Sequence, residues 1–205
     1  MTLLLGLLRH AETEWSRDKR LQGHTDVPLS DDARAWLARH RLPAIARGMQ
    51  VVSSPLVRCT ETAHWLGLER VVIEPRLVEM SWGEWEGRRL AELRAEFGAS
   101  MALNEARGFD FEPPHGESPR QVLERVRPWL AQLAQAGKPT LGLAHRGVIR
   151  VVFAAATGWD LLGRAPAKLD WAALHVFALD ADGRPSVHRL NVPLDAADAA
   201  GPQTP

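Results

Sequence analysis

The chain has 205 residues, of which 45% are apolar, and its 25 lysines and arginines balance its 25 aspartates and glutamates. The resulting formal net charge of zero excludes a general binder of nucleic acids or membrane surfaces, because such affinity rests on excess positive charge. It does not exclude a local basic pocket. The only cysteine is Cys59, which excludes an intramolecular disulfide and a thiolate zinc cluster.

The length suits one domain with a sizeable core. No stretch of the sequence is apolar enough over a sufficient length to span a bilayer. The apolar run over residues 3–8 is too short for a signal peptide and has no basic residues before it. We therefore expect a cytoplasmic protein.

The first part of the chain alternates predicted strands and helices. The run over residues 3–8 is continuously apolar, as in a strand buried on both faces, and it ends at Arg9. Ser30 is a suitable N-cap, and acidic residues follow it in the first helical turn. In chain order we predict a strand at 3–8, a helix at 30–38, a strand at 49–53, a helix at 57–66 and a β segment at 71–73.

The second part begins with a loosely patterned segment at about 81–116, which we call the flap and expect to cover a site. Ser118 then opens a helix with a capping box and a proline at the first helical position, and Gly137 ends that helix. The elements predicted here are a short helix around 89–97, a helix at 118–136, a strand at 140–144, a helix at 147–156 and a hairpin of 172–179 with 186–190.

This alternation predicts a three-layer α/β/α sandwich with a mostly parallel central sheet. We expect a single domain over residues 1–192 that includes the flap. The segment 193–205 is rich in alanine, aspartate and proline, and we expect it to be a disordered tail.

Chemically useful side chains follow several of the predicted strands. Two strands end in histidine, at His10 and His145, and a third leads to Arg58 near a helix N-terminus. If these strands are parallel and adjacent, their ends meet at the edge where open α/β folds bind ligands. Together with Arg9, these groups would form a pocket that favours a dianion such as phosphate. Glu79 follows the third β segment and could supply the acid.

At this point the sequence resembles the histidine phosphatase superfamily, in its phosphoglycerate mutase-like branch and of the phosphatase type. An ordered set of motifs carries the resemblance over roughly residues 3–190, which is more specific than any single motif. The motifs are RHAETEW at 9–15, RLQG at 20–23, SSPLVR at 53–58 with TA at 62–63, LVE at 77–79 with GEWEG at 83–87, GES at 116–118 and AHRG at 144–147.

The resemblance implies a role for each of five residues. His10 would be the nucleophile that forms a phosphohistidine, with its second ring nitrogen held by a backbone carbonyl. Arg9, Arg58 and a charged His145 would bind the phosphoryl oxygens and stabilise the transition state. Glu79, with a raised pKa, would protonate the leaving alkoxide and then help to activate water. No metal and no other cofactor is required.

Three further residues are candidates for substrate binding. Many members of the family have asparagine where this chain has Ser16, whose shorter hydroxyl could make only a single contact with the phosphoryl group. Gln22 and Gly23 are candidates for shaping the pocket, with a role in a turn as the alternative. For the acid, Glu84 and Glu86 are alternatives to Glu79.

Other features have simpler interpretations. The remaining histidines lack the spacing of a metal site, and Cys59 is interpreted as a small buried hydrophobe. An apolar wall such as Trp82 could raise the pKa of Glu79.

Three functions remain open from the sequence. The leading one is a phosphomonoesterase that acts on a small phosphorylated metabolite. The second is a cofactor-dependent phosphoglycerate mutase, and the compact segment after Glu79 favours hydrolysis over it. The third is a catalytically silent binding protein of the same fold, which the presence of both a nucleophile and an acid disfavours. We expect a small phosphate ester as the partner, with no nucleic acid and no membrane; the sequence leaves the oligomeric state open.

Overall fold

The computed structural model describes residues 3–197, which form a six-stranded sheet in the order β4-β3-β5-β1-β6-β7. β4, β3, β5 and β1 are parallel neighbours, whereas β6 runs antiparallel to both β1 and β7. The strands are β1 Leu3–Arg9, β2 His40–Arg41, β3 Gln50–Ser53, β4 Val72–Ile73, β5 Thr140–Ala144, β6 Leu174–Leu179, β7 Pro185–Val192 and β8 Asp195–Ala196. The α-helices are α1 Glu14–Arg17, α2 Asp31–Leu37, α3 Val57–Trp65, α4 Leu90–Glu105, α5 Pro119–Ala136 and α6 Arg146–Thr157.

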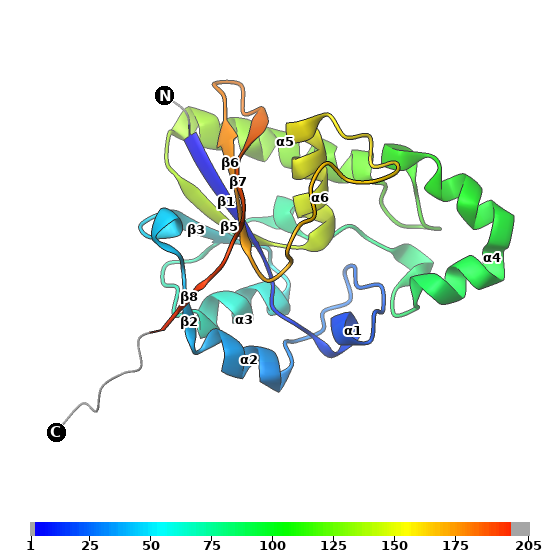
Figure 1. The fold of residues 1–205 in the computed structure, drawn as a ribbon, viewed down its shortest axis with the longest axis horizontal. Helices are drawn as coiled ribbons and strands as arrows, with labels where there is room; N and C mark the ends of the chain where they lie inside the picture. The colour runs from blue at the N-terminus through cyan, green and yellow to red at the C-terminus, as the bar shows by residue number, and fades with distance from the viewer. Residues whose placement is uncertain (1–2, 198–205) are drawn as a thin grey trace.

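Helices cover both faces of this sheet, with α5 and α6 on one side and α2 and α3 on the other (Figure 1). The alternation of side chains along β1 explains the two layers. Leu5 and Leu7 pack into the core beneath α5 and α6, whereas Leu8 packs into the core beneath α2 and α3. The predicted three-layer α/β/α architecture is therefore confirmed.

The carboxyl ends of three strands meet at one edge of the sheet, because β3, β5 and β1 are adjacent and parallel. Arg9 pairs with Ala144, and the amide of His10 continues the ladder by donating to the Ala144 carbonyl at 3.0 Å. The amide of Ser54 likewise donates to the Leu143 carbonyl at 2.9 Å. The ends of β1, β3 and β5 thus converge as the sequence predicted.

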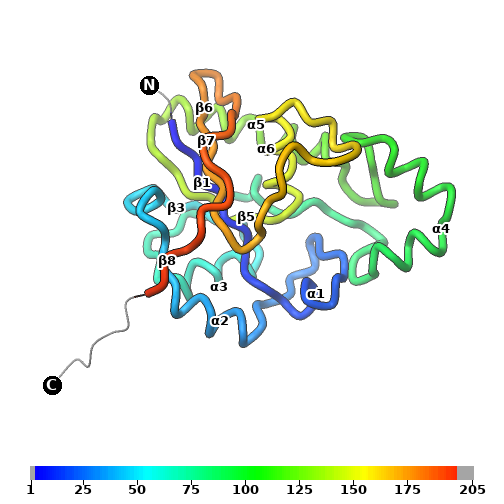
Figure 2. Tube along the Cα trace, in the orientation of Figure 1, coloured from blue at the N-terminus to red at the C-terminus, as the bar shows by residue number. Residues whose placement is uncertain are grey.

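The flap forms more helix than expected. α4 continues well past the predicted end near residue 97, although its backbone breaks at Gly98, where φ is 46° and ψ is −118°. Glycine tolerates this conformation, so the chain can turn there and resume a helix over residues 99–105. In Figure 2 the α4 segment extends away from the sheet beyond α6.

Three short elements, α1, β2 and β8, were not predicted. The four-residue helix α1 begins after Thr13, which caps it together with Ser16. β8 pairs with β2 in a separate two-stranded sheet, and Asp195 forms an ion pair with Arg47 at 2.7 Å. The expectation of a disordered tail from residue 193 is therefore wrong for the segment up to 197, because β8 finds a partner strand far away in the sequence. Residues 198–205 of that expectation lie outside the described part of the chain.

No helix in residues 3–197 is long and apolar enough to cross a membrane.

Candidate active site

His10 lies just past the end of β1, and it is almost fully buried. Its Nδ1 contacts the Ala11 carbonyl at 2.7 Å, so Nδ1 carries the proton and Nε2 keeps a lone pair. Burial, together with the charges of Arg9 and Arg58, lowers the pKa of His10 well below its usual value. The imidazole is therefore a neutral base with Nε2 available for attack at phosphorus.

The backbone around His10 is held from α3. The Ala11 amide donates to the Thr62 hydroxyl at 3.1 Å, and that hydroxyl donates to the Arg58 carbonyl at 2.6 Å. A carbonyl fixed in this way keeps the imidazole in one tautomer. The sequence analysis matched Thr62 only as part of a motif and gave it no role.

Arg58 and His145 form a buried pair beneath His10, and neither side chain is measurably exposed. The rings of His10 and His145 are 5.2 Å apart between centroids. Arg58 Nε donates to His145 Nδ1 at 3.2 Å, so the proton of His145 resides on Nε2, which donates to the Ser54 hydroxyl at 2.7 Å. The other two guanidinium nitrogens donate to the carbonyls of Thr25 and Gly23, at 3.1 and 2.7 Å.

This geometry sets the charge of His145 before a phosphoryl group binds. Burial, followed by the charges of Arg58, His10 and Arg9, lowers the pKa of His145 well below its usual value. His145 is therefore neutral in this arrangement, whereas the expected charged form applies to a complex with a phosphoryl group. A phosphoryl dianion brought next to it would favour the charged form and raise that pKa.

Arg9 and Gln22 present hydrogen-bond donors at the pocket. Both Arg9 Nε and Gln22 Nε2 are buried and have no hydrogen-bond partner within residues 3–197. The amide oxygen of Gln22 accepts from Thr13 Oγ1 at 2.9 Å, which fixes the direction of its NH₂ group. Buried donors without partners are costly, and their presence indicates a place for an anionic ligand.

Ser16 and Gly23 are placed less favourably for binding substrate. Ser16 lines the pocket, but its hydroxyl donates to the Thr13 carbonyl at 3.0 Å and accepts from the Thr13 amide. Its one hydrogen is thus already engaged in capping α1. Gly23 is absent from the residues that line the two best-defined pockets of the described chain, and its carbonyl accepts from Arg58. Gly23 is therefore positioned to support Arg58 rather than to touch a substrate.

Glu79 lies in the same pocket as His10 and Arg9, and its side chain is almost fully buried. Oε1 accepts from the amides of Met80 and Gly147, at 2.8 and 3.0 Å, and Oε2 is 3.1 Å from the Gly147 nitrogen. Burial raises the pKa of Glu79, although the two amides and the charges of Arg58 and Arg9 oppose that rise. Oε2 has only one contact, so it is the oxygen best able to hold a proton.

The backbone of Glu79 is held by residues that the sequence analysis did not assign. Arg125 on α5 donates to the carbonyls of Val78 and Glu79, at 2.8 and 3.1 Å, and forms an ion pair with Glu117 at 2.9 Å. His24 Nε2 lies 2.8 Å from the Glu79 carbonyl. Of the sequence motifs, only GES at 116–118 includes a residue of this network, Glu117.

The two alternative acids lie outside the pocket lined by His10 and Glu79. Glu86 accepts from the amides of His24 and Thr25, both at 2.7 Å, and so fixes the loop whose carbonyls hold Arg58. Glu84 has 65% of its side chain exposed. The geometry thus favours Glu79 as the acid.

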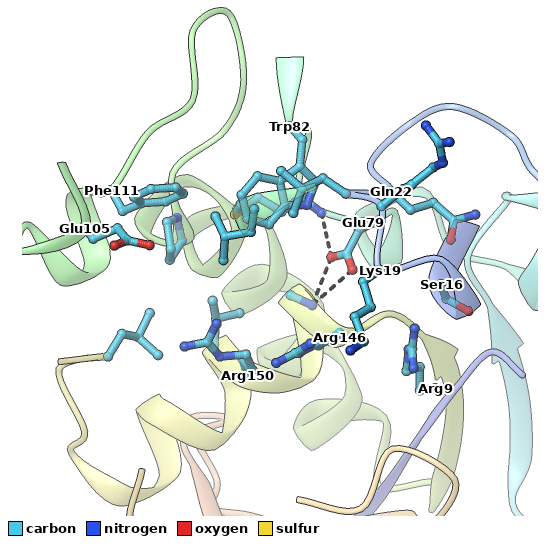
Figure 3. Close-up of a pocket in the computed structure, with 18 of the residues that line it drawn as sticks. Arg9, Ser16, Lys19, Gln22, Glu79, Trp82, Glu105, Phe111, Arg146 and Arg150 are labelled. Atoms are coloured by element: carbon cyan, nitrogen blue, oxygen red, sulfur yellow. Dashed lines mark hydrogen bonds between the residues drawn. The ribbon is translucent and has the colours of Figure 1, made fainter. Parts of the chain in front are cut away.

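The pocket has a volume of about 640 Å³, and it is lined by six cationic side chains and two carboxylates. The cations are Arg9, Lys19, Arg20, Arg94, Arg146 and Arg150, and the carboxylates are Glu79 and Glu105. This local excess of positive charge lies in a chain whose net charge is zero. In Figure 3, Trp82 and Phe111 from the flap lie on one side of the pocket, and Arg146 and Arg150 from α6 lie on the opposite side.

The flap thus contributes directly to the wall of the pocket. Trp82 and Phe111 contact each other with their ring centroids 5.9 Å apart. Trp82 and Met80 belong to the apolar lining near Glu79, as the raised pKa of that carboxyl requires.

Cys59 is fully buried in the core beneath α2 and α3, and burial raises the pKa of its thiol to about 12. It is therefore a buried hydrophobe, as predicted. Within residues 3–197 no three histidine, cysteine, aspartate or glutamate side chains come together as ligands for a metal ion.

Comparison with known proteins identifies the family of this chain. Residues 5–193 match the model of the histidine phosphatase superfamily (branch 1). A glucosyl-3-phosphoglycerate phosphatase from Mycolicibacterium vanbaalenii is 34% identical over 179 residues, which cover 78% of each chain. A 2,3-bisphosphoglycerate-dependent phosphoglycerate mutase from Azorhizobium caulinodans is 29% identical over 165 residues, which cover 74% of this chain and 80% of the mutase.

Comparison with solved structures agrees with this family. A solved structure of a mycobacterial glucosyl-3-phosphoglycerate phosphatase in complex with inorganic phosphate superimposes with a TM-score of 0.73 at 27% identity. The match covers 93% of this chain and 98% of that chain. With a family match over nearly the whole described sequence, this chain belongs to branch 1 of the histidine phosphatase superfamily.

Proposed function

We propose that the protein is a phosphomonoesterase that hydrolyses a small phosphorylated metabolite through a phosphohistidine at His10, without a metal ion. The observation that carries this proposal is the tautomer of His10. Its Nδ1 proton is donated to the Ala11 carbonyl, which leaves the Nε2 lone pair in a pocket lined by Arg9 and Glu79. The phosphatases among its relatives support hydrolysis as the outcome.

In the first step, His10 Nε2 attacks phosphorus, and the bond from phosphorus to the ester oxygen breaks. Glu79 gives its proton to the departing alkoxide, a transfer that its raised pKa permits at neutral pH. Arg9 and Arg58 bind the phosphoryl oxygens, and His145 becomes charged as the dianion enters. Arg9 Nε has no other partner within residues 3–197 and can stabilise the transition state without reorganisation, whereas the Nε–H of Arg58 must leave His145 Nδ1 when that nitrogen takes a proton.

In the second step, water attacks the phosphohistidine. The Glu79 carboxylate accepts a proton from that water, and the bond between phosphorus and Nε2 breaks. Inorganic phosphate leaves, and both His10 and Glu79 return to their starting forms. A water molecule must therefore reach the face of the phosphoryl group next to Glu79.

Phosphoglycerate mutase activity is the weaker alternative. It is supported by mutases among the relatives, at 29 and 31% identity. The phosphatases match at 32 and 34% identity, and the segment after Glu79 is short in this chain. A catalytically silent binding protein is disfavoured because a neutral His10 and a buried Glu79 line the same pocket.

The proposal is tested by hydrolysis of p-nitrophenyl phosphate in the presence of EDTA. We expect the wild-type protein to keep its activity with the chelator, and His10→Ala to lose at least about 10³-fold in kcat, because the nucleophile is gone. Loss of activity on chelation, or full activity of the mutant, would contradict the mechanism. Interconversion of phosphoglycerates that depends on a bisphosphoglycerate primer would instead identify a mutase.

We keep the cytoplasm as the proposed compartment, which the single cysteine favours. Neither a nucleic acid nor a membrane is proposed as a partner, since the net charge is zero. Cell fractionation tests the location directly.

A further inference from the structure

Of the six cationic side chains that line the pocket, the proposed mechanism uses only Arg9, and two of the other five lie together on one helix. Arg146 and Arg150 both line the pocket and come from the first two turns of α6. They are four residues apart, which places them on the same face of the helix, about 6 Å apart along its axis. Neither side chain forms a hydrogen bond or an ion pair with any residue in 3–197.

Each guanidinium nevertheless stacks on a tryptophan that lies outside the pocket, and this contact fixes its orientation. The guanidinium of Arg146 lies over the ring of Trp171 at 5.0 Å, and that of Arg150 lies over the ring of Trp159 at 5.4 Å. Stacking of this kind leaves the edge of the guanidinium, with its N–H donors, available for an anion. Neither tryptophan lines the pocket that the two arginines line.

The charges in this part of the pocket also favour an anionic ligand. Burial, together with the neighbouring charge of Arg146, lowers the pKa of Arg150. Arg150 is half-buried and Arg146 is exposed; the charge of Glu79 partly offsets the effect on Arg150, but neither guanidinium forms an ion pair with a carboxylate in residues 3–197. Two other cations of the pocket differ, because Arg94 pairs with Glu105 at 2.7 Å and Arg20 donates to the Gly87 carbonyl at 2.9 Å.

The position of the pair separates it from the phosphoryl group. The proposed nucleophile lies at the end of β1 beside Arg9, whereas α6 leads away from that edge of the sheet. In Figure 3, Arg146 and then Arg150 lie progressively farther from Arg9 along the floor of the pocket, opposite Trp82 and Phe111. A phosphoryl group held at His10 would leave the rest of the substrate between the aromatic wall and the two arginines.

We propose that Arg146 and Arg150 form a subsite for a second anionic group, so that the substrate is a phosphomonoester that also bears a carboxylate or a second phosphate. This inference rests on the proposed phosphomonoesterase function and narrows its substrate class. Guanidinium groups suit this task because their fork of donors matches both carboxylate and phosphate oxygens.

Matched pairs of substrates test the subsite. 3-Phosphoglycerate and glycerol 3-phosphate differ only in a carboxylate against a hydroxymethyl group, and 1,3-propanediol bisphosphate and monophosphate differ in the second phosphate. In at least one pair, we expect the wild-type protein to prefer the member with two anionic groups by about 10- to 100-fold in kcat/KM, as charged hydrogen bonds allow. The preferred pair identifies the second anion.

The variants Arg146→Gln and Arg150→Gln should each reduce this preference about 10-fold. Arg184→Gln is the matched control: Arg184 lies in the turn of the β6–β7 hairpin, at the opposite end of the sheet, with 78% of its side chain exposed. It should leave the preference intact. A general structural defect would slow both members of a pair equally, so an unchanged preference in both pocket variants would overturn the subsite. A wild-type protein without any preference would overturn it as well.

A binding measurement separates this inference from the proposed function. Calorimetric titration of the His10→Ala protein with 3-phosphoglycerate, 1,3-propanediol bisphosphate and their two partners needs no turnover. A tighter Kd for a doubly anionic ester, lost when Arg150→Gln is added, supports the subsite even if hydrolysis fails. Equal Kd values for both members of each pair overturn it.

Discussion

At the scale of single residues, the site depends on protonation states set by burial. His10 and Glu79 lie in one pocket, yet burial keeps the imidazole neutral and raises the pKa of the carboxyl. These are the states that a nucleophile and an acid require. The backbone at Gly147 passes close to the Glu79 carboxylate. A glycine is needed there, because a Cβ would collide with Glu79 Oε1.

Glu79→Gln tests the assignment of the acid. The amide cannot give a proton to an alkoxide, so we expect kcat for glycerol 3-phosphate to fall by about 10²- to 10⁴-fold. The fall should be smaller for p-nitrophenyl phosphate, whose leaving group is stable without a proton. In the wild type, activity on the alkyl ester should decline as pH rises through the elevated pKa of Glu79, and the variant should lack this limb.

The control for this experiment is Glu84→Gln, because Glu84 is an exposed carboxylate from the same part of the chain. It should keep both the rate and the pH profile. An equal loss on the two substrates in Glu79→Gln would show that Glu79 acts on folding or binding and not on the leaving group.

At the scale of elements, α5 and α6 each position a different part of the pocket. α6 begins directly after His145 and brings Arg146, Gly147 and Arg150 to the pocket. α5 packs against the sheet and holds the Glu79 backbone through Arg125. The position of Glu79 therefore depends on a helix that begins 40 residues later in the sequence, at Pro119.

Ser118→Ala tests how far the cap of α5 contributes to stability. The Ser118 hydroxyl accepts from the Gln121 amide at 3.3 Å, and the Gln121 side chain accepts from the Ser118 amide at 2.7 Å. Loss of such a cap costs about 1 kcal/mol, so thermal denaturation should show a lower Tm. Ser100→Ala, on the exposed side of α4, removes a hydroxyl without removing a cap and should leave the Tm nearly unchanged.

At the scale of the whole molecule, buried histidines tie stability to pH. Burial lowers the pKa of His10, His145 and His175 in the folded protein. The unfolded chain, in which the histidine pKa is about 6.5, therefore binds more protons as pH falls below that value. The free energy of unfolding should rise with pH up to about 6.5, by at most about 1.4 kcal/mol per pH unit for each such histidine. Glu79 has the opposite effect on the free energy of unfolding. Because its pKa is raised in the folded protein, the folded state binds this proton more tightly than the unfolded chain does, and the contribution of Glu79 to stability falls as pH rises.

Denaturant unfolding at pH values between 5 and 7 measures this dependence. His175 lies in β6 outside the pocket lined by Glu79, so His175→Gln should weaken the slope without removing the site. His115→Gln is the control, since 85% of that side chain is exposed. A slope that is the same in wild type and His175→Gln would mean that this histidine does not contribute to the linkage.

Most of the fold could be predicted from the sequence, because most of its helices and strands follow from local properties of the chain. The apolar run at 3–8, the Ser118 cap and the Gly137 stop each became the element that their chemistry predicts. The errors had two causes, one in a distant partner strand and one in a local break of a helix. Asp195–Ala196 is a strand only because it meets His40–Arg41, and α4 resumes past Gly98 because glycine permits the break.

By itself, the sequence determined the family and the residues that end the strands of the sheet, because motifs and apolar runs are local properties of the chain. Only the tertiary structure decided which polar groups face one another. It placed Glu79, but not Glu84 or Glu86, in the pocket of His10, left His145 neutral beside Arg58, and engaged the Ser16 hydroxyl in a helix cap. It also brought Arg146 and Arg150 into the pocket without carboxylate partners. Burial, charge pairing and the pKa of a side chain depend on distances between segments far apart in sequence, and those distances exist only in the folded molecule.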